Sequence, residues 1–229
     1  MVEMLFRCNI LALVGGGTHP KFPQNKVLLW DDNQQKCIGE LSYKSTVKNV
    51  KLRKDKIIVV LEERIYVYNF SDLRLVDAID THANPKGLCA VSSDNVPILA
   101  CLDKVKKGTV KLINYDTNKN TSIDAHSSGI SCMNLNFTGS LLATASDKGT
   151  IIKIFSTADP TILQEVRRGS DKALIHSLSF DRYSNWMACT SDRETVHIFA
   201  MQKDKLRITD ENDEEKKTGG ASAKNKKHA

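Results

Sequence analysis

The chain has 229 residues, of which 41% are hydrophobic and 26% are charged, with a formal net charge of +6. This length and composition suit one globular domain with a core, and no run reaches the roughly 18 apolar residues that cross a bilayer. The mild charge excludes a polyelectrolyte of the kind that binds nucleic acid. The first 17 residues lack the basic start and the cleavage site of a secretory signal, so we expect a cytosolic protein.

Twelve short segments along the chain have the apolar or alternating pattern of β-strands. In chain order they are residues 10–14, 27–31, 57–61, 65–69, 98–102, 110–114, 130–135, 141–145, 152–156, 176–180, 186–190 and 196–200. Ten of them form two families, whose members start at 10, 57, 98, 141 and 186 and at 27, 65, 110, 152 and 196. A period of about 40 to 45 residues with several strands per repeat is typical of the blades of a WD-type β-propeller.

The sequence between the segments agrees with this fold. Residues 146–149 (Ser-Asp-Lys-Gly) predict a tight turn between two strands, and no long helical period occurs in the body. We therefore predict an all-β fold, a partial WD-repeat β-propeller over residues 1–201. Residues 202–229 hold eight Lys/Arg and six Asp/Glu with few apolar residues, which predicts a disordered tail. Its basic end has an alternative reading as a weak membrane or nuclear-import element.

Residues with catalytic or metal-binding patterns are hard to find in this chain. Gly15, Gly16 and Gly17 are not followed by a helical pattern, which excludes a P-loop or a dinucleotide fingerprint. The six histidines show no metal-ligand spacing, and the six cysteines form no C-x-x-C pair, so we expect the cysteines to be reduced and buried. We predict a protein that is not an enzyme and needs no cofactor or metal.

Anion binding is the chemistry that remains, and it centres on Arg167, Arg168 and Gly169. Successive side chains of a strand point to opposite faces, so the two arginines would serve two pockets. Guanidinium groups suit phosphate oxygens, hydroxyls suit a phosphorylated polyol, and glycine permits close backbone approach. The candidates on the first side are His126, Thr144, Ser146, Thr150, Lys153 and Arg167. The candidates on the second side are Arg168, Gly169, Ser191, Thr195 and His197.

Several candidates also have a structural interpretation. His126 follows Asp124-Ala125, where many WD-type blades place a histidine that bonds to a turn aspartate, here Asp147. Thr150 and Thr195 are ordinary strand residues by β propensity, and Lys153 is equally a solvated strand lysine. The arginine pair also fits an edge strand whose charges discourage aggregation. His197 lies between two apolar neighbours, so we expect it to face away from the core.

At these residues the sequence resembles the PROPPIN or WIPI-type propellers of autophagy, whose hallmark is Phe/Leu-Arg-Arg-Gly on an outer strand. This chain has Val-Arg-Arg-Gly at residues 166–169, and residues 4–9, 11–17, 25–32, 84–89, 143–146 and 195–199 also look like that family. The resemblance implies binding of phosphatidylinositol 3-phosphate and the 3,5-bisphosphate, one head group on each side of the arginine pair. Arg167 would anchor the first site and Arg168 the second. Lys153 stands where some members have arginine, which keeps the charge but loses the bidentate fork.

The resemblance also implies a place and partners. Members of the family are recruited from the cytoplasm to preautophagosomal, endosomal or vacuolar/lysosomal membranes, and they bind autophagy proteins including a lipid-transfer partner. A scaffold role with weak or lost lipid binding is the alternative, with residues 16–25 and 81–87 as docking loops.

The repeats match about four and a half of the seven blades that the family has, beginning inside the second blade. The last strand of the sixth blade, the seventh blade, and the loop that carries apolar residues into the bilayer have no counterpart in the sequence. We expect an incomplete propeller with marginal stability or self-association, because uncovered blade faces and strand edges are apolar. We also expect weak lipid affinity that rests on the two arginines.

Overall fold

The computed structural model describes residues 1–202, which form nineteen β-strands in five antiparallel sheets. No helix occurs among these residues, and so none that could span a membrane. We call the sheets blades A to E in chain order. Blade A consists of β1 (Val2–Met4), β2 (Ile10–Leu13), β3 (Lys26–Asp31) and β4 (Lys36–Ser42). Blade B consists of β5 (Asn49–Leu52), β6 (Lys56–Val60), β7 (Arg64–Asn69) and β8 (Leu75–Asp80).

The remaining three blades follow the same up-and-down order. Blade C consists of β9 (Cys89–Val91), β10 (Ile98–Leu102), β11 (Thr109–Asn114) and β12 (Lys119–Asp124). Blade D consists of β13 (Ile130–Leu135), β14 (Leu141–Ser146), β15 (Ile151–Ser156) and β16 (Ile162–Arg167). Blade E has three strands, β17 (Ile175–Phe180), β18 (Trp186–Ser191) and β19 (Val196–Ala200).

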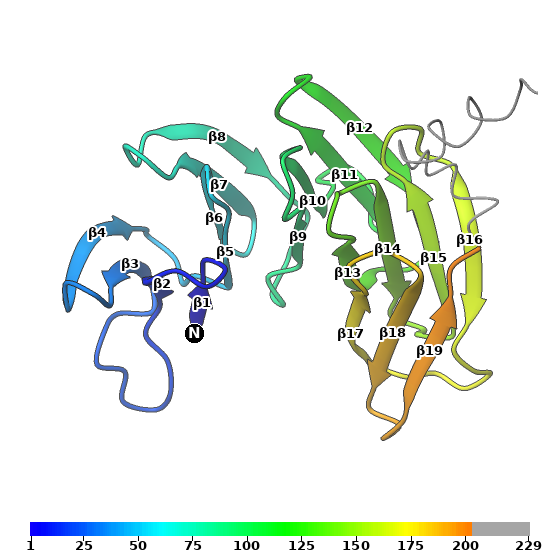
Figure 1. The fold of residues 1–229 in the computed structure, drawn as a ribbon. Coiled ribbons are helices and arrows are strands. Elements are labelled where there is room, and N and C mark those ends of the chain that lie inside the picture. Colours follow the sequence, from blue (N-terminus) through cyan, green and yellow to red (C-terminus); the bar gives the residue numbers. More distant parts are fainter. Residues whose placement is uncertain (203–229) are drawn as a thin grey trace, which may run out of the picture.

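The blades stand side by side in an open arc (Figure 1). The first strands of successive blades contact one another, β1 with β5, β5 with β9, β9 with β13 and β13 with β17. Figure 1 shows blade A and blade E at the two ends of the arc, with β1 well separated from β17. The predicted all-β, incomplete propeller is confirmed, and each of the twelve predicted segments matches a strand within one residue at either end.

Four apolar clusters between neighbouring blades hold the arc together. Blade D contributes to two of them, because successive residues of its central strands point to opposite faces. Leu142 and Phe155 pack toward blade C, whereas Ile152 and Ile154 pack toward blade E. Each of these side chains is at most 2% exposed, and burial of one such side chain contributes roughly 1.5 to 3 kcal/mol. The interior of the protein therefore lies between blades, and blade D is covered on both faces.

The turn predicted at residues 146–149 joins β14 to β15. The Gly149 N–H donates to the Ser146 carbonyl at 2.9 Å, and Gly149 has a φ of +64°. A Cβ on Gly149 would lie 1.9 Å from the carbonyl oxygen of Ala173, so no other residue fits without rearrangement. This turn brings the end of blade D against the segment that leads into blade E.

Not every sequence expectation about the body is correct. Cys89, Cys101, Cys132 and Cys189 are buried free thiols, but Cys8 and Cys37 are exposed. The two exposed cysteines lie in the loop before β2 and on the outer strand β4, where no neighbouring blade covers them. The predicted tail lies outside the described residues from residue 203 onward.

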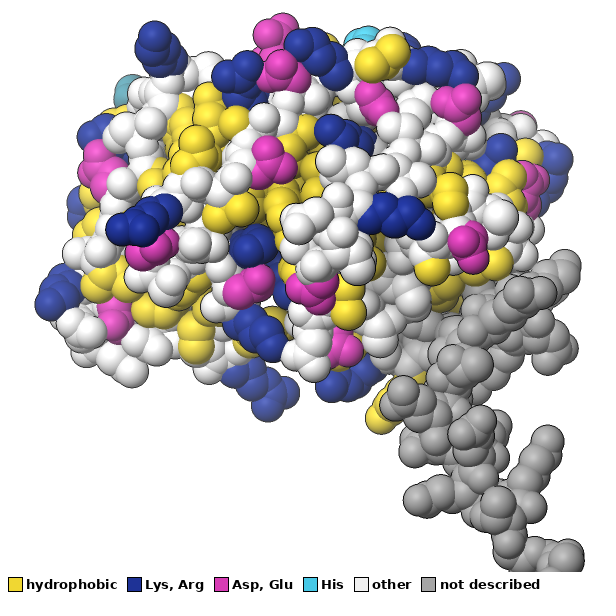
Figure 2. All heavy atoms as spheres, turned by 90° about the horizontal axis from the view of Figure 1, so that it is seen from above, with side chains coloured by type: hydrophobic (Ala, Val, Ile, Leu, Met, Phe, Trp, Pro, Cys, Tyr) yellow, Lys and Arg dark blue, Asp and Glu magenta, His cyan; other side chains and the backbone are white. Residues whose placement is uncertain are grey.

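Charged side chains are interspersed over the face seen from above, with Lys and Arg next to Asp and Glu and hydrophobic atoms between them (Figure 2). Blade E exposes apolar side chains on one of its sheet faces. On blade E, Trp186, Val196 and Ile198 are 53%, 63% and 66% exposed, although they lie on strands. This open face of blade E is the side turned away from blade D.

Candidate anion-binding sites

Arg167 and Arg168 diverge at the end of the outer strand of blade D. Arg167 is the last residue of β16 and pairs in register with Ile151 of β15. Arg168 follows the strand, and its backbone N–H donates to the Thr150 carbonyl at 2.9 Å. The Arg167 side chain is exposed, whereas Arg168 is only 8% exposed. The two side chains are thus in different surroundings, as strand alternation predicts.

The candidates of the first pocket gather on the face of blade D that is turned toward blade C. Thr144 of β14 pairs with Lys153 of β15, and Ser146 lies two residues further along the same strand. His126, from the segment between blades C and D, reaches this face: its Nε2 lies 3.0 Å from Thr144 Oγ1 and 3.3 Å from the Thr144 carbonyl oxygen. Because a carbonyl only accepts, this geometry suits an Nε2–H donor.

The structural interpretation of His126 expected a hydrogen bond to Asp147, and this partner is wrong. Asp147 does not appear among the hydrogen-bond partners of His126 in the described part of the chain; its backbone N–H donates to the Gly129 carbonyl at 2.8 Å. His126 bonds to Thr144 instead, because Thr144 points from β14 toward the segment that carries His126. The histidine is therefore tied directly to another candidate of the first pocket.

Glu165 is a residue of this pocket that the sequence reasoning missed. It pairs in register with Lys153, and its Oε1 lies 3.6 Å from Lys153 Nζ. Glu165 stands two residues before Arg167 on β16, so the two side chains share a face. That alternation was the available signal. The pocket accordingly combines the basic residues Lys153 and Arg167 with one carboxylate.

The partners of Arg167 differ from those of Lys153. Within the described residues, the Arg167 guanidinium has no hydrogen bond or ion pair. Lys153 is held by Glu165, with 23% of its side chain exposed. The first pocket therefore offers one uncommitted guanidinium and one ammonium that is already paired.

Burial lowers the pKa of His126, and the nearby Lys153 charge acts in the same direction. A base whose pKa is lower in the folded chain than its usual 6.5 is protonated more easily when unfolded. We therefore expect stability to be fully present above about pH 6.5 and to fall as the pH drops from there toward the lowered pKa. Thermal melts from pH 7.5 to 5 would show this fall, and His126→Asn would reduce it. An equal fall in His126→Asn would contradict the assignment.

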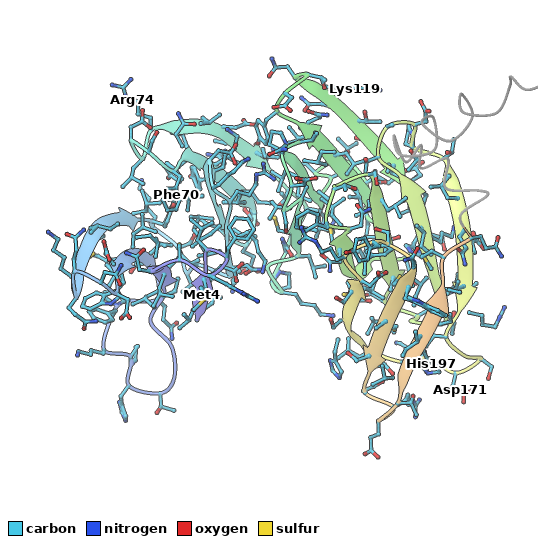
Figure 3. All side chains as sticks on the ribbon, viewed as in Figure 1. Met4, Phe70, Arg74, Lys119, Asp171 and His197 are labelled. Atoms are coloured by element: carbon cyan, nitrogen blue, oxygen red, sulfur yellow. The ribbon has the colours of Figure 1, made fainter. Side chains whose placement is uncertain are left out.

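The candidates of the second pocket lie between blades D and E. Ser191, 8% exposed, is the last residue of β18, and His197 pairs in register with the buried Cys189 of the same strand. Thr195 Oγ1 lies 3.1 Å from His197 Nε2. A Cβ built on Gly169 would meet open space, so the backbone there is accessible. Figure 3 labels His197 on β19 and Asp171 in the loop after β16, at the same end of these strands.

Arg168 is engaged in hydrogen bonds to the backbone. Its Nε donates to the Gly149 carbonyl at 2.7 Å, and its Nη2 donates to the Asp171 carbonyl. Arg168 lies two residues after Val166, which packs in the cluster between blades D and E, so alternation places Arg168 on the blade E side. Burial raises the pKa of Cys189, and the Arg168 charge opposes this shift. The side chain thus connects the turn before β15 to the loop that enters blade E.

Two further expectations about the candidate residues are wrong. His197 does not face away from the core: it shares the blade D side of β19 with Phe199, while its neighbours Val196 and Ile198 are the exposed residues. The sequence pattern misled because the open face of blade E carries apolar residues. Thr150 and Thr195 are not strand residues; each immediately precedes a strand, β15 and β19 respectively.

The PROPPIN family model matches residues 1–224. The chain belongs to the PROPPIN family. This PROPPIN is 43% identical over 208 residues to autophagy-related protein 18e of Arabidopsis thaliana, covering 90% of this chain and 55% of that relative. It is 42% identical over 200 residues to SVP1-like protein 2 of Neurospora crassa, covering 87% of this chain and 46% of that relative.

Solved PROPPIN structures share the fold. Kluyveromyces marxianus Hsv2 superposes with a TM-score of 0.76 at 26% identity, covering 89% of this chain and 64% of that one. KlAtg21, solved in complex with the coiled coil of AgAtg16, superposes with a TM-score of 0.77 at 27% identity, covering 88% of this chain and 66% of that one. The chain thus spans about half the length of the curated relatives it matches. The two sets of pocket residues stay a prediction.

Proposed function

We propose that this PROPPIN binds phosphoinositide head groups, phosphatidylinositol 3-phosphate and the 3,5-bisphosphate, and acts as a membrane-recruited effector in autophagosome formation. The observation that carries the proposal is the Arg167 guanidinium, which is exposed and has no partner among the described residues, on the face of blade D that also carries Lys153, Thr144 and the His126 contact. A guanidinium without an acidic partner can donate two parallel N–H groups to phosphate oxygens. Family membership supports the same function.

The chemistry proposed is recognition without reaction. Among the described residues there is no group of three or more His, Cys, Asp or Glu side chains that could hold a metal. Binding of the head group would bring the protein from the cytoplasm to preautophagosomal, endosomal or vacuolar/lysosomal membranes. Affinity for a single head group is weak, so retention at the membrane depends on the second pocket or on protein partners.

Co-sedimentation with liposomes that contain phosphatidylinositol 3-phosphate tests the proposal through Arg167. We expect Arg167→Thr to lower the affinity at least about tenfold, because it removes a charge-assisted pair of hydrogen bonds worth about 1.4 kcal/mol or more. Arg74→Thr is the matched control: it removes the same charge from a side chain that is 84% exposed on blade B, far from the pocket (Figure 3). Equal pelleting of the two variants and the wild type would refute the proposal.

A scaffold function is the second candidate, and the complex of KlAtg21 with the coiled coil of AgAtg16 favours it. In this PROPPIN, residues 16–25 and 81–87 form loops that would dock an autophagy protein, including a lipid-transfer partner. A pull-down that retains the partner with Arg167→Thr would favour this function. Loss of the partner with Arg167→Thr would count against it.

A further inference from the structure

Glu165 gives the first pocket an uneven charge. On the face of blade D that carries the pocket, the paired positions of β15 and β16 place Lys153 opposite Glu165 and Ile151 opposite Arg167. Lys153 Nζ is 3.6 Å from the Glu165 carboxylate, and Arg167 has no acidic partner among the described residues. The two basic groups are therefore not equivalent toward an anion.

The two halves of the pocket suit different chemical groups. Beside Arg167, a phosphate meets a free guanidinium. Beside Lys153, a phosphate would also meet the Glu165 carboxylate, and like charges a few ångströms apart repel strongly in a partly buried site. Hydroxyl groups suit that position better, because a carboxylate accepts from them and an ammonium donates to them.

The burial of Thr144 and Lys153 strengthens the difference between the Arg167 side and the Lys153 side of the pocket. Thr144, which pairs with Lys153 from the other side, is fully buried, and Lys153 is more buried than Glu165, with 23% and 47% of their side chains exposed. The carboxylate is thus the more exposed member of the pair. A ring bound with its phosphate on Arg167 would present its neighbouring substituent to Glu165.

We propose that Glu165 determines which inositol ring the first pocket accepts: it takes hydrogen bonds from a free hydroxyl and excludes a second phosphate on the adjacent ring carbon. The inference rests on the proposed function, since it assumes that a phosphoinositide ring occupies this pocket. Glu165 then favours a ring whose phosphate on Arg167 has an unphosphorylated neighbour.

The test compares liposomes that contain phosphatidylinositol 3-phosphate with liposomes that contain phosphatidylinositol 3,4-bisphosphate. In wild type we expect the monophosphate to bind more tightly. Glu165→Gln should raise the affinity for the 3,4-bisphosphate relative to the monophosphate about tenfold, since it removes the repulsion but keeps the shape. Glu40→Gln is the matched control. Glu40 lies on β4, the outer strand of blade A, and is likewise paired with a lysine, Lys26 of β3.

The outcomes separate the inference from the function on which it rests. A ratio of the two affinities that stays the same in Glu165→Gln, or an equal gain for both lipids, overturns the selectivity role and leaves phosphoinositide binding intact. Failure of both the wild type and Glu165→Gln to bind either lipid, with an unchanged thermal melt, overturns the proposed function and the inference together.

Discussion

Arg168→Thr is expected to lower the free energy of unfolding by about 3 kcal/mol, whereas Arg167→Thr leaves it nearly unchanged. Arg168 is 8% exposed and donates to the carbonyls of Gly149 and Asp171. Each hydrogen bond from a charged donor contributes roughly 1.5 to 3 kcal/mol. Loss of the bond to Gly149, a buried residue, also leaves its carbonyl without a partner, whereas Asp171 is exposed to water. Arg167 is exposed and makes no comparable bond within the described residues.

Thermal melts and urea titrations of the two single variants would measure this difference. For a domain of this size, about 3 kcal/mol corresponds to a drop of roughly 6 to 12 °C in the melting temperature. Arg168→Lys should recover only part of the stability, because an ammonium lacks the fork that reaches both carbonyls. Equal melting temperatures for Arg167→Thr and Arg168→Thr would show that the backbone bonds of Arg168 contribute little.

Because Arg168 contributes to stability, replacing both arginines together is a poor test of lipid binding. A protein in which both arginines are replaced loses two things at once. It loses the free guanidinium of Arg167, and it loses the hydrogen bonds by which Arg168 connects the turn before β15 to the loop that enters blade E. Reduced lipid binding by such a variant would not separate recognition from folding. Arg167→Thr alone is the cleaner probe of the first pocket, and the second pocket is better probed through His197, which is partly exposed and bonds only to Thr195 among the described side chains.

The sequence predicts the central strands of each blade well because burial on both faces makes them continuous apolar runs. In β6, for example, residues Ile57 to Val60 are all at most 1% exposed. The outer strands β4, β8 and β12 are mostly exposed and carry mixed side chains, so no apolar period identifies them. Their position follows from the pairing of neighbouring strands, which the repeat alone does not give.

In the two sets of candidate residues, too, some features follow from local sequence pattern and others depend on tertiary structure. Strand alternation was enough to separate Arg167 from Arg168, and the repeat brought Thr144 and Lys153 to one face. The Glu165 carboxylate required the register between β15 and β16, which includes a shift between Ile154 and Phe155. The backbone bonds of Arg168 required the course of the loop after β16. Alternation along β16 indicates that Glu165 shares a face with Arg167, but its pairing with Lys153 and the backbone bonds of Arg168 depend on tertiary structure.

The open face of blade E is expected to make the 229-residue protein associate as its concentration rises. Trp186, Val196 and Ile198 are each more than half exposed on neighbouring strands, so they form a contiguous apolar surface. The outer edge of β19 also has no strand partner among the described residues. An apolar face next to a free strand edge promotes pairing between chains.

Light scattering over a range of protein concentrations, with Val196→Thr plus Ile198→Thr as the test variant, would measure the association. Threonine keeps the β-branched shape that a strand favours but removes the apolar surface, so we expect the variant to remain monomeric where the wild type associates. Leu75→Thr is the control, since Leu75 is 54% exposed on the outer strand of blade B. A wild type that stays monodisperse at every concentration would show that this face is not a contact surface. Association that persists equally in the double variant would show that this face does not carry it.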